Sequence, residues 1–325
     1  MTRKRLILLA AALVGATVLA APHKVAPYMG AACCDTNGRI LFADNADRSA
    51  YPASVTKLMT ALLVIEDVRA RRYGFFDTVV ATPDVARSEA SWIGLKAGDK
   101  VTVRDLLIAL MVHSANDAAI ALGVNSSGSL NGFIVRMNAR AKELGMASAK
   151  YYNPNGLPPK PRYPWKSFNV TTASDQLKLA VQLLKYPEIL EFTSIKTAAL
   201  VKAPDGFRVV VTRRVNQAFQ EPKLKPGEKT VMQLCNHNNI MVKDKLKVFD
   251  DAGRECVDGL KTGYIEAGGS SGGLTGSRNG HRVIVAVLGS DNELDARGRV
   301  LKMSSKVRDE HARKILLDAL ESTKW

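Results

Sequence analysis

Ser54 and Lys57 could do chemistry together, because they stand three residues apart in the segment Ser-Val-Thr-Lys at residues 54–57. Residues at this spacing share one face of a helix, so the hydroxyl and the amine can touch. A serine becomes a nucleophile when a base takes its proton, and a neutral lysine amine can be that base. Since an ordinary lysine has a pKa of about 10.4, the amine must be buried or lie near a second cation. The pair predicts acyl transfer at Ser54, although a capped amphipathic helix has the same spacing.

Ser114 and Asn116 form a second polar pair, at a break between two expected helices. The Ser114 hydroxyl could pass a proton to a leaving amine, and the Asn116 amide could hold Lys57 and a substrate carbonyl. By themselves, Ser and Asn at a helix junction are ordinary caps.

A third segment, Lys-Thr-Gly at residues 261–263, ends an apolar strand. Lys261 could supply the second cation and Thr262 could bind a carboxylate, while Gly263 would let a substrate backbone lie along the strand edge. A strand end that enters a turn would explain this tripeptide alone. The three segments in this order, however, are the signature of penicillin-binding proteins and class A β-lactamases, and each occurs in the structural context that the signature requires.

From about residue 28 to residue 300, the sequence resembles the serine-type D-Ala-D-Ala carboxypeptidases, which are low-molecular-mass penicillin-binding proteins. The segments that carry the resemblance are residues 51–60, 113–118, 153–157 and 257–263. The resemblance implies that Ser54 is the acylated nucleophile and Lys57 its base, and it gives Ser114, Asn116, Lys261 and Thr262 the roles described above. It implies a peptidoglycan pentapeptide as substrate, β-lactams as covalent inhibitors, and no metal or organic cofactor.

The resemblance also implies two further contacts with the substrate. The backbone N–H groups of Ser54 and Tyr264 would form the oxyanion hole, and Arg297 would bind the substrate carboxylate. One departure is the Gly- and Ser-rich run at residues 268–273, where the family often has a bulky residue and a cysteine.

The remaining pattern shows which elements would position these residues. A hairpin is expected from residues 28–34 and 39–43, because Asn37-Gly38 between them is a strong turn signal. Helical periodicity and capping predict helices over residues 54–71, 103–112, 116–122, 130–144, 172–184 and 297–320. Strands are expected over residues 198–201, 207–211, 257–261, 272–276 and 283–289, and the proline-rich residues 152–168 are expected to form a loop.

Strands thus occur at both ends of the chain and helices fill the middle. We expect an α/β region, whose late strands are antiparallel because short turns join them, and an all-α region, with a cleft between the two. This is a β-lactamase/penicillin-binding-protein-like fold, in which helices flank an antiparallel sheet beside a helical subdomain.

The N-terminus has the pattern of a secretory signal. Arg3, Lys4 and Arg5 precede an apolar run at residues 6–21, which is shorter than the roughly 20 residues that a spanning helix needs. We expect a signal peptide at residues 1–21, with a retained anchor as the alternative, and one catalytic domain at residues 22–325. The protein would then be exported to the periplasm or cell envelope.

The formal net charge of +15 favours a polyanionic neighbour. Nucleic acid is not expected, because no aromatic-basic module or helix-turn-helix spacing accompanies the charge. An anionic wall or membrane surface fits better, so peripheral association is conceivable. The last helix could be an amphipathic membrane anchor, although packing against the sheet accounts better for its apolar stripe.

Export would permit disulfides among Cys33, Cys34, Cys235 and Cys256, and a Cys235–Cys256 bond is conceivable. Small buried thiols are at least as good an interpretation. No C-x-x-C pair occurs, so no metal site is expected.

Four alternatives to a carboxypeptidase stay open. A β-lactamase is disfavoured because no Glu-x-x-Leu-Asn segment lies between residues 116 and 261. Residues 268–272 match the nucleophile-elbow pattern of α/β-hydrolases, which would need a following helix and a histidine such as His281 or His311. A D,D-endopeptidase would use the same acyl-enzyme. A non-catalytic wall-binding module would not require the paired nucleophile and base.

Overall fold

The computed structural model describes residues 27–215, 218–290, 293–294, 300–302 and 305–322. The expected signal peptide and Arg297 lie outside these residues.

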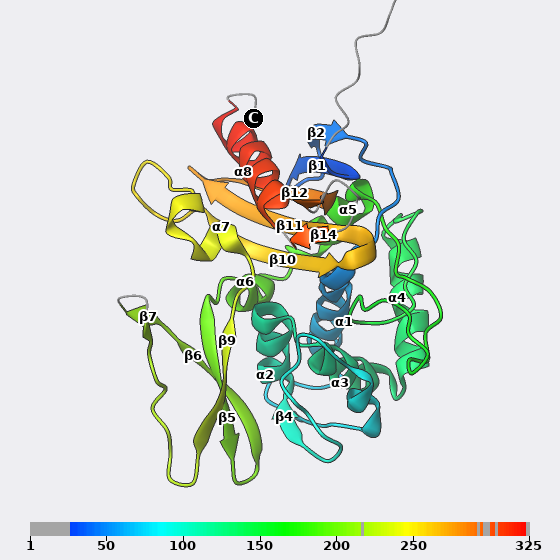
Figure 1. The fold of residues 1–325 in the computed structure, drawn as a ribbon, viewed down its shortest axis with the longest axis vertical. Coiled ribbons are helices and arrows are strands. Elements are labelled where there is room, and N and C mark those ends of the chain that lie inside the picture. The colour runs from blue at the N-terminus through cyan, green and yellow to red at the C-terminus, as the bar shows by residue number, and fades with distance from the viewer. Residues whose placement is uncertain (1–26, 216–217, 291–292, 295–299, 303–304, 323–325) are drawn as a thin grey trace, which may run out of the picture.

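The central element is a five-stranded antiparallel sheet with the strand order β10-β11-β12-β1-β2 (Figure 1). Its strands are β1 (Gly30–Asp35), β2 (Ile40–Asp44), β10 (Val257–Ile265), β11 (Gly269–Arg278) and β12 (His281–Ser290). The two chain ends meet where β1 pairs with β12, with Gly30 opposite Leu288. The predicted hairpin and the antiparallel late strands are thus confirmed, and β10 lies at an edge of the sheet.

Both faces of this sheet are buried, which explains why β12 is apolar along most of its length. Val283, Val285 and Val287 lie in one core cluster with residues of α8 (Lys306–Glu321). The alternate residues Ile284 and Ala286 lie in a second cluster with α1 (Lys57–Arg69) and α5 (Ala173–Leu183). Since successive side chains of a strand point to opposite faces, one apolar run serves two cores.

The helical half packs against the second of these faces. It contains α2 (Val103–Ile108), a π-helical turn (Ala109–His113), α3 (Asn116–Ser127), α4 (Leu130–Glu143) and α6 (Glu188–Thr193). The short α7 (Asn239–Val242) belongs instead to the core cluster that contains α8. In α1, residues 57–65 are all buried. This helix is therefore a core helix rather than an amphipathic one. As predicted, residues 152–168 contain no helix or strand.

The region expected to be all helical carries a sheet of its own, with the strand order β3-β4-β6-β5-β9. The strands are β3 (Thr78–Val80), β4 (Lys100–Thr102), β5 (Thr197–Ala203), β6 (Gly206–Thr212) and β9 (Lys229–Cys235). Of these, β5 and β6 were predicted as strands, whereas β3, β4 and β9 were not. The pairs β7–β8 (Arg214–Val215, Ala218–Phe219) and β13–β14 (Glu293–Leu294, Val300–Lys302) are short hairpins.

Several helix boundaries differ from the prediction. The helix expected over residues 116–122 continues to Ser127. Residues 53–56 form the 3-10 turn η1 (Ala53–Thr56), and the α-helix begins only at Lys57. The helix after residue 103 changes to π geometry at Ala109. The last helix begins at Lys306, because Val300–Lys302 pairs as β14 instead.

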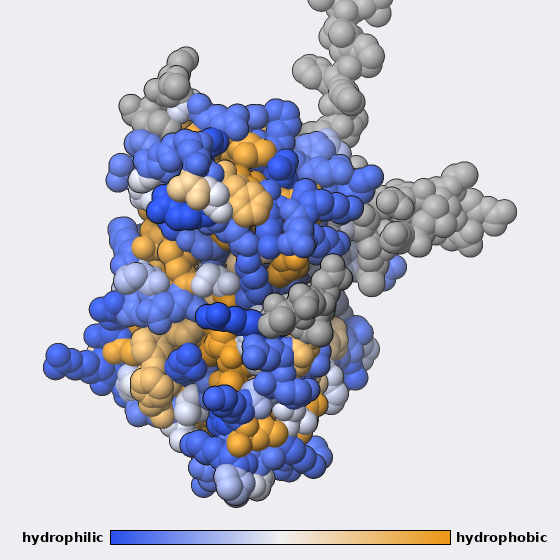
Figure 2. All heavy atoms as spheres, turned by 90° about the vertical axis from the view of Figure 1, so that its left-hand side faces the viewer, coloured by the Kyte–Doolittle hydropathy of each residue, from blue (hydrophilic) through white to orange (hydrophobic). Residues whose placement is uncertain are grey.

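The structure decides whether the last helix packs on the sheet or is left free as an anchor. It also decides whether the cysteines form a disulfide. The apolar stripe of α8, including Ile315, Leu316 and Leu320, is buried against the sheet. None of the four cysteines forms a disulfide, so the conceivable Cys235–Cys256 bond is not formed. Among the described residues, no single helix has the length and apolarity to cross a membrane; only α3 and α4 taken together, bent by 85°, do so. Figure 2 shows a mainly hydrophilic face with separate hydrophobic patches.

Candidate active site

Ser54 lies in η1, where the backbone is packed tightly against β10. A Cβ atom added to Gly263 of β10 would lie 2.6 Å from the Ser54 nitrogen and 2.9 Å from the Pro52 oxygen. Any larger residue would therefore push β10 away from the nucleophile. The structure gives Gly263 a steric role next to Ser54 itself, in addition to the strand-edge role inferred from the sequence.

A second glycine supports the same turn from the other side. Gly156 has a φ of +84°, and a Cβ atom there would lie 1.8 Å from the Ala53 carbonyl oxygen. Neighbouring backbone in this loop is held by the Asn153 side chain, whose Oδ1 accepts from the N–H groups of Asn155 and Gly156 at 3.2 and 2.6 Å. The loop at residues 153–157 is thus a rigid support of the nucleophile turn.

The Lys57 amine is completely buried and makes three hydrogen bonds. It donates to Ser54 Oγ at 2.8 Å, to Asn116 Oδ1 at 2.7 Å and to the Asn155 carbonyl oxygen at 2.7 Å. The Asn155 carbonyl was not identified from the sequence as a partner of Lys57. In the protonated amine, these acceptors satisfy all three N–H donors. In the neutral amine, two donors remain for Asn116 and Asn155, and the lone pair can accept from the Ser54 hydroxyl.

Burial and charge together favour the neutral form of this amine. Burial lowers the pKa of Lys57 well below its ordinary value, the Lys261 cation lowers it further, and buried Asp117 opposes both effects. The pKa of Lys261 is itself lowered to about 7, first by burial and then by Arg308. Lys57 can therefore act as a base at pH values where an exposed lysine is charged.

The loop at residues 88–96 holds the segment that carries Ser114 and Asn116. The Asn116 side chain donates to the Glu89 carbonyl at 2.6 Å, and its backbone N–H donates to the Ser91 carbonyl at 2.8 Å. Ser114 ends the π-helical turn with a left-handed backbone, at φ 62° and ψ 30°. This sharp reversal brings the buried Ser114 into the same cleft as Ser54.

The cleft has a volume of about 440 Å³ and brings together most of the residues expected to meet substrate. Its lining residues are Ser54, Ala90, Ser91, Ser114, His237, Thr262, Gly263, Tyr264, Ser270, Ser305 and Arg308. Because β10 is an edge strand, alternate backbone N–H and C=O groups point away from β11 and toward this side. Thr262, Gly263 and Tyr264 thus lie where an extended peptide could pair with the strand.

Arg308 was not identified as a site residue from the sequence. Its side chain is only 4% exposed and lines the cleft. The signal was its spacing, since Arg308 stands four residues before Ala312, on the buried stripe of α8. A charged residue on a buried stripe is a reason to look for a function. Arg297 stays a prediction.

His237 is a second cleft residue that the sequence did not reveal. Its ring centroid lies 5.9 Å from that of His113, at the end of the π-helical turn. The pKa of His237 is lowered to about 4, mainly because the surrounding protein desolvates it and then because Lys261 and other cations lie near. Burial lowers the pKa of His113 as well. Both rings are therefore neutral at pH 7, and neither is hydrogen-bonded to Ser54 as a triad base would be.

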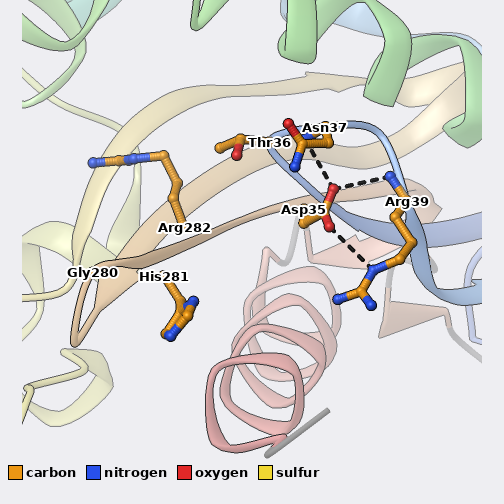
Figure 3. A pocket seen from close by; sticks show the side chains of 7 residues that line it. All are labelled: Asp35, Thr36, Asn37, Arg39, Gly280, His281 and Arg282. Atoms are coloured by element: carbon orange, nitrogen blue, oxygen red, sulfur yellow. Dashed lines mark hydrogen bonds and ion pairs between the residues drawn. The ribbon is translucent and has the colours of Figure 1, made fainter. Parts of the chain in front are cut away.

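A separate hollow of about 460 Å³ lies between the β1–β2 and β11–β12 turns (Figure 3). There Asp35 accepts hydrogen bonds from Asn37 and Arg39. None of the catalytic candidates lines this hollow. The nucleophile-elbow alternative also fails, because strand β11 follows Gly268 where a helix would be needed.

Replacing Lys261 with methionine should shift the pH dependence of acylation. At low pH Lys57 is protonated and cannot take the serine proton, so acylation rises as the pH increases through the pKa of Lys57. Without the Lys261 cation this pKa rises, and the acid limb should move to higher pH. Acylation rates with a fluorescent penicillin across the pH range would measure the shift. An unchanged acid limb in Lys261→Met would contradict the coupling of the two amines.

Comparison with known proteins agrees with the family resemblance that the sequence motifs indicate. The sequence matches the profile of the D-alanyl-D-alanine carboxypeptidase family over residues 31–292. It is 30% identical over 269 residues to D-alanyl-D-alanine carboxypeptidase DacF of Bacillus subtilis, an alignment that covers 82% of this chain and 58% of that protein. It is also 31% identical over 159 residues to a D-alanyl-D-alanine endopeptidase of Pseudomonas aeruginosa, covering 48% of this chain and 47% of that protein.

Solved structures agree in fold. A peptidoglycan synthesis regulatory factor from Streptococcus pneumoniae superimposes with a TM-score of 0.70 at 28% identity, over 91% of this chain and 72% of that one. An ampicillin-bound penicillin-binding protein from Listeria monocytogenes gives a TM-score of 0.64 at 26% identity, over 92% of this chain and 99% of that one. Because the family profile covers most of the sequence, this chain belongs to the D-alanyl-D-alanine carboxypeptidase family of serine peptidases.

Proposed function

We propose that this chain is a serine-type D,D-carboxypeptidase, which removes the terminal D-alanine from peptidoglycan stem peptides. The observation that carries the proposal is the buried Lys57 amine, 2.8 Å from Ser54 Oγ, beside a cleft lined by residues of the edge strand β10. A wall-binding module would have no need of a nucleophile paired with a base of lowered pKa.

The proposed reaction has two steps. Ser54 Oγ attacks the carbonyl carbon of the penultimate D-alanine while Lys57 Nζ takes the hydroxyl proton. The C–N bond then breaks, and the leaving D-alanine amine receives a proton by way of Ser114. Water hydrolyses the resulting ester, which restores the Ser54 hydroxyl and releases the shortened peptide. The N–H groups of Ser54 and Tyr264 would stabilise the tetrahedral oxyanion.

The substrate would enter as an extra strand along the exposed edge of β10. Thr262 and Arg308 both line the cleft, and the Arg308 charge acts on the neighbouring Lys261. A hydroxyl beside two cationic side chains is a suitable site for the terminal carboxylate. β-Lactams, which carry a carboxylate and an acylating carbonyl, would occupy the same site and remain covalently bound to Ser54.

A pentapeptide that ends in D-Ala-D-Ala tests the proposal. After incubation with the protein, the peptide mass should fall by that of one alanine residue. Cleavage of cross-linked peptides only would favour the D,D-endopeptidase, in keeping with the relative from Pseudomonas aeruginosa. No cleavage of either peptide, together with no labelling by penicillin, would favour the non-catalytic module.

We also propose that the protein is exported to the cell envelope, because its N-terminal sequence has the pattern of a secretory signal. The basic residues and apolar run at residues 1–21 and the net charge of +15 suit a protein that works against an anionic wall. Cell fractionation with the mature mass measured would test this. Recovery of the full-length chain in the cytosol would contradict it.

A further inference from the structure

Arg308 forms a buried ion pair with the residue that follows it on α8. Its Nε and Nη2 atoms both donate to Asp309 Oδ1, at 2.9 and 2.5 Å. The side chains of both residues are only 4% exposed. Burying two opposite charges costs both of them their hydration, so such a pair is a weak source of stability. Its position in the cleft indicates another purpose.

The Asp309 carboxylate is held on its other side as well. Its Oδ2 atom accepts from Asn239 Nδ2 of α7 at 2.7 Å and from Ser305 Oγ at 2.9 Å. Asn239 Nδ2 also donates to Ser305 Oγ at 2.8 Å. Asp309 is therefore held in place by two residues other than Arg308. Its hydrogen bonds to Arg308 in turn restrict the orientation of the guanidinium group.

The rest of the Arg308 side chain is confined by β11. A Cβ atom added to Gly272 would lie 3.1 Å from Arg308 Cδ, so the glycine leaves room for the arginine stem to cross the strand. Arg308 Nη1 lies 3.5 Å from the Ser271 carbonyl oxygen. The Gly- and Ser-rich run, which departs from the family pattern, thus forms the floor under Arg308.

We propose that Asp309 is a positioning residue for recognition of a free C-terminal carboxylate. Held by Asn239 and Ser305, it fixes one edge of the Arg308 guanidinium and leaves the arginine in the cleft beside Thr262. A fixed guanidinium gives directional hydrogen bonds to a carboxylate, whereas a mobile one loses conformational entropy each time substrate binds. The inference rests on the proposed carboxypeptidase function. It explains why the site would prefer a peptide with a free C-terminal carboxylate.

The test compares two substrates of the full-length protein, a pentapeptide with a free terminal carboxylate and the same peptide as its C-terminal amide. In Asp309→Asn, KM for the acid should rise about tenfold, as expected for loss of a charge-assisted hydrogen bond, while kcat changes little. The preference for acid over amide should fall by a similar factor. Asp318→Asn is the matched control, because Asp318 pairs with Lys314 on the exposed side of the same helix.

Asn239→Ala, which frees Asp309 from the other side, should shift the preference in the same direction. It also provides a second variant if Asp309→Asn folds poorly, as judged from its thermal midpoint. An unchanged acid-to-amide preference in a folded Asp309→Asn or Asn239→Ala protein would overturn the inference. Failure of the wild-type protein to release D-alanine from the acid would instead overturn the proposed function.

Discussion

Ser54→Ala should abolish covalent labelling by a fluorescent penicillin and should reduce release of D-alanine by about 10⁴-fold or more. In the proposed mechanism the Ser54 oxygen is the atom that becomes acylated, and a water molecule in the cleft cannot form the covalent acyl-enzyme in its place. Folding should be retained, because Ser54 is only partly buried and Lys57, which donates to its hydroxyl, keeps two other acceptors in the variant. Labelled gels and peptide mass spectra would measure both effects.

Ser91→Ala is a matched control for this experiment. Ser91 lines the same cleft, but its hydroxyl is not among the three acceptors of Lys57. This variant should therefore keep most of its labelling. Persistent labelling of Ser54→Ala at the wild-type rate would mean that another residue is the nucleophile, and the proposed mechanism would be wrong.

Lys57→Met should reduce the acylation rate by about 10²–10⁴-fold, the usual contribution of a positioned general base. Methionine has a similar length but cannot accept the Ser54 proton, and the oxygens of Asn116 and Asn155 lose their shared donor. Raising the pH should not restore the acylation rate of Lys57→Met, whereas it should restore that of Lys261→Met. Stopped-flow acylation by penicillin at several pH values would measure the loss.

Lys178→Met serves as the control for removal of a lysine amine. Lys178 is exposed on α5 and donates to the Gly145 carbonyl, so its replacement should leave acylation unchanged. If Lys57→Met acylated as fast as the wild-type protein, another group would have to be the base. The lowered pKa of Lys57 would then play no part in acylation.

The sequence by itself was enough to predict the candidate reacting residues and to determine most of the local elements. The Ser54–Lys57 spacing, the helix junction at Ser114 and the strand before Lys261 are short-range patterns, because helix periodicity and strand composition depend on residues close in the chain. The same holds for the hairpin around Asn37-Gly38 and for the antiparallel late strands. Local order of residues was therefore enough to predict these features.

Tertiary structure decided which groups complete the site. The Asn155 carbonyl contacts Lys57, which is 98 residues away in the sequence. Gly156 and Gly263 both lie so close to the backbone around Ser54 that a Cβ atom would not fit there. Arg308 enters the cleft because α8 packs on the sheet with that face inward, and β3, β4 and β9 become strands mainly through their distant partners. Such contacts depend on how segments far apart in the sequence pack together, so local sequence patterns do not predict them.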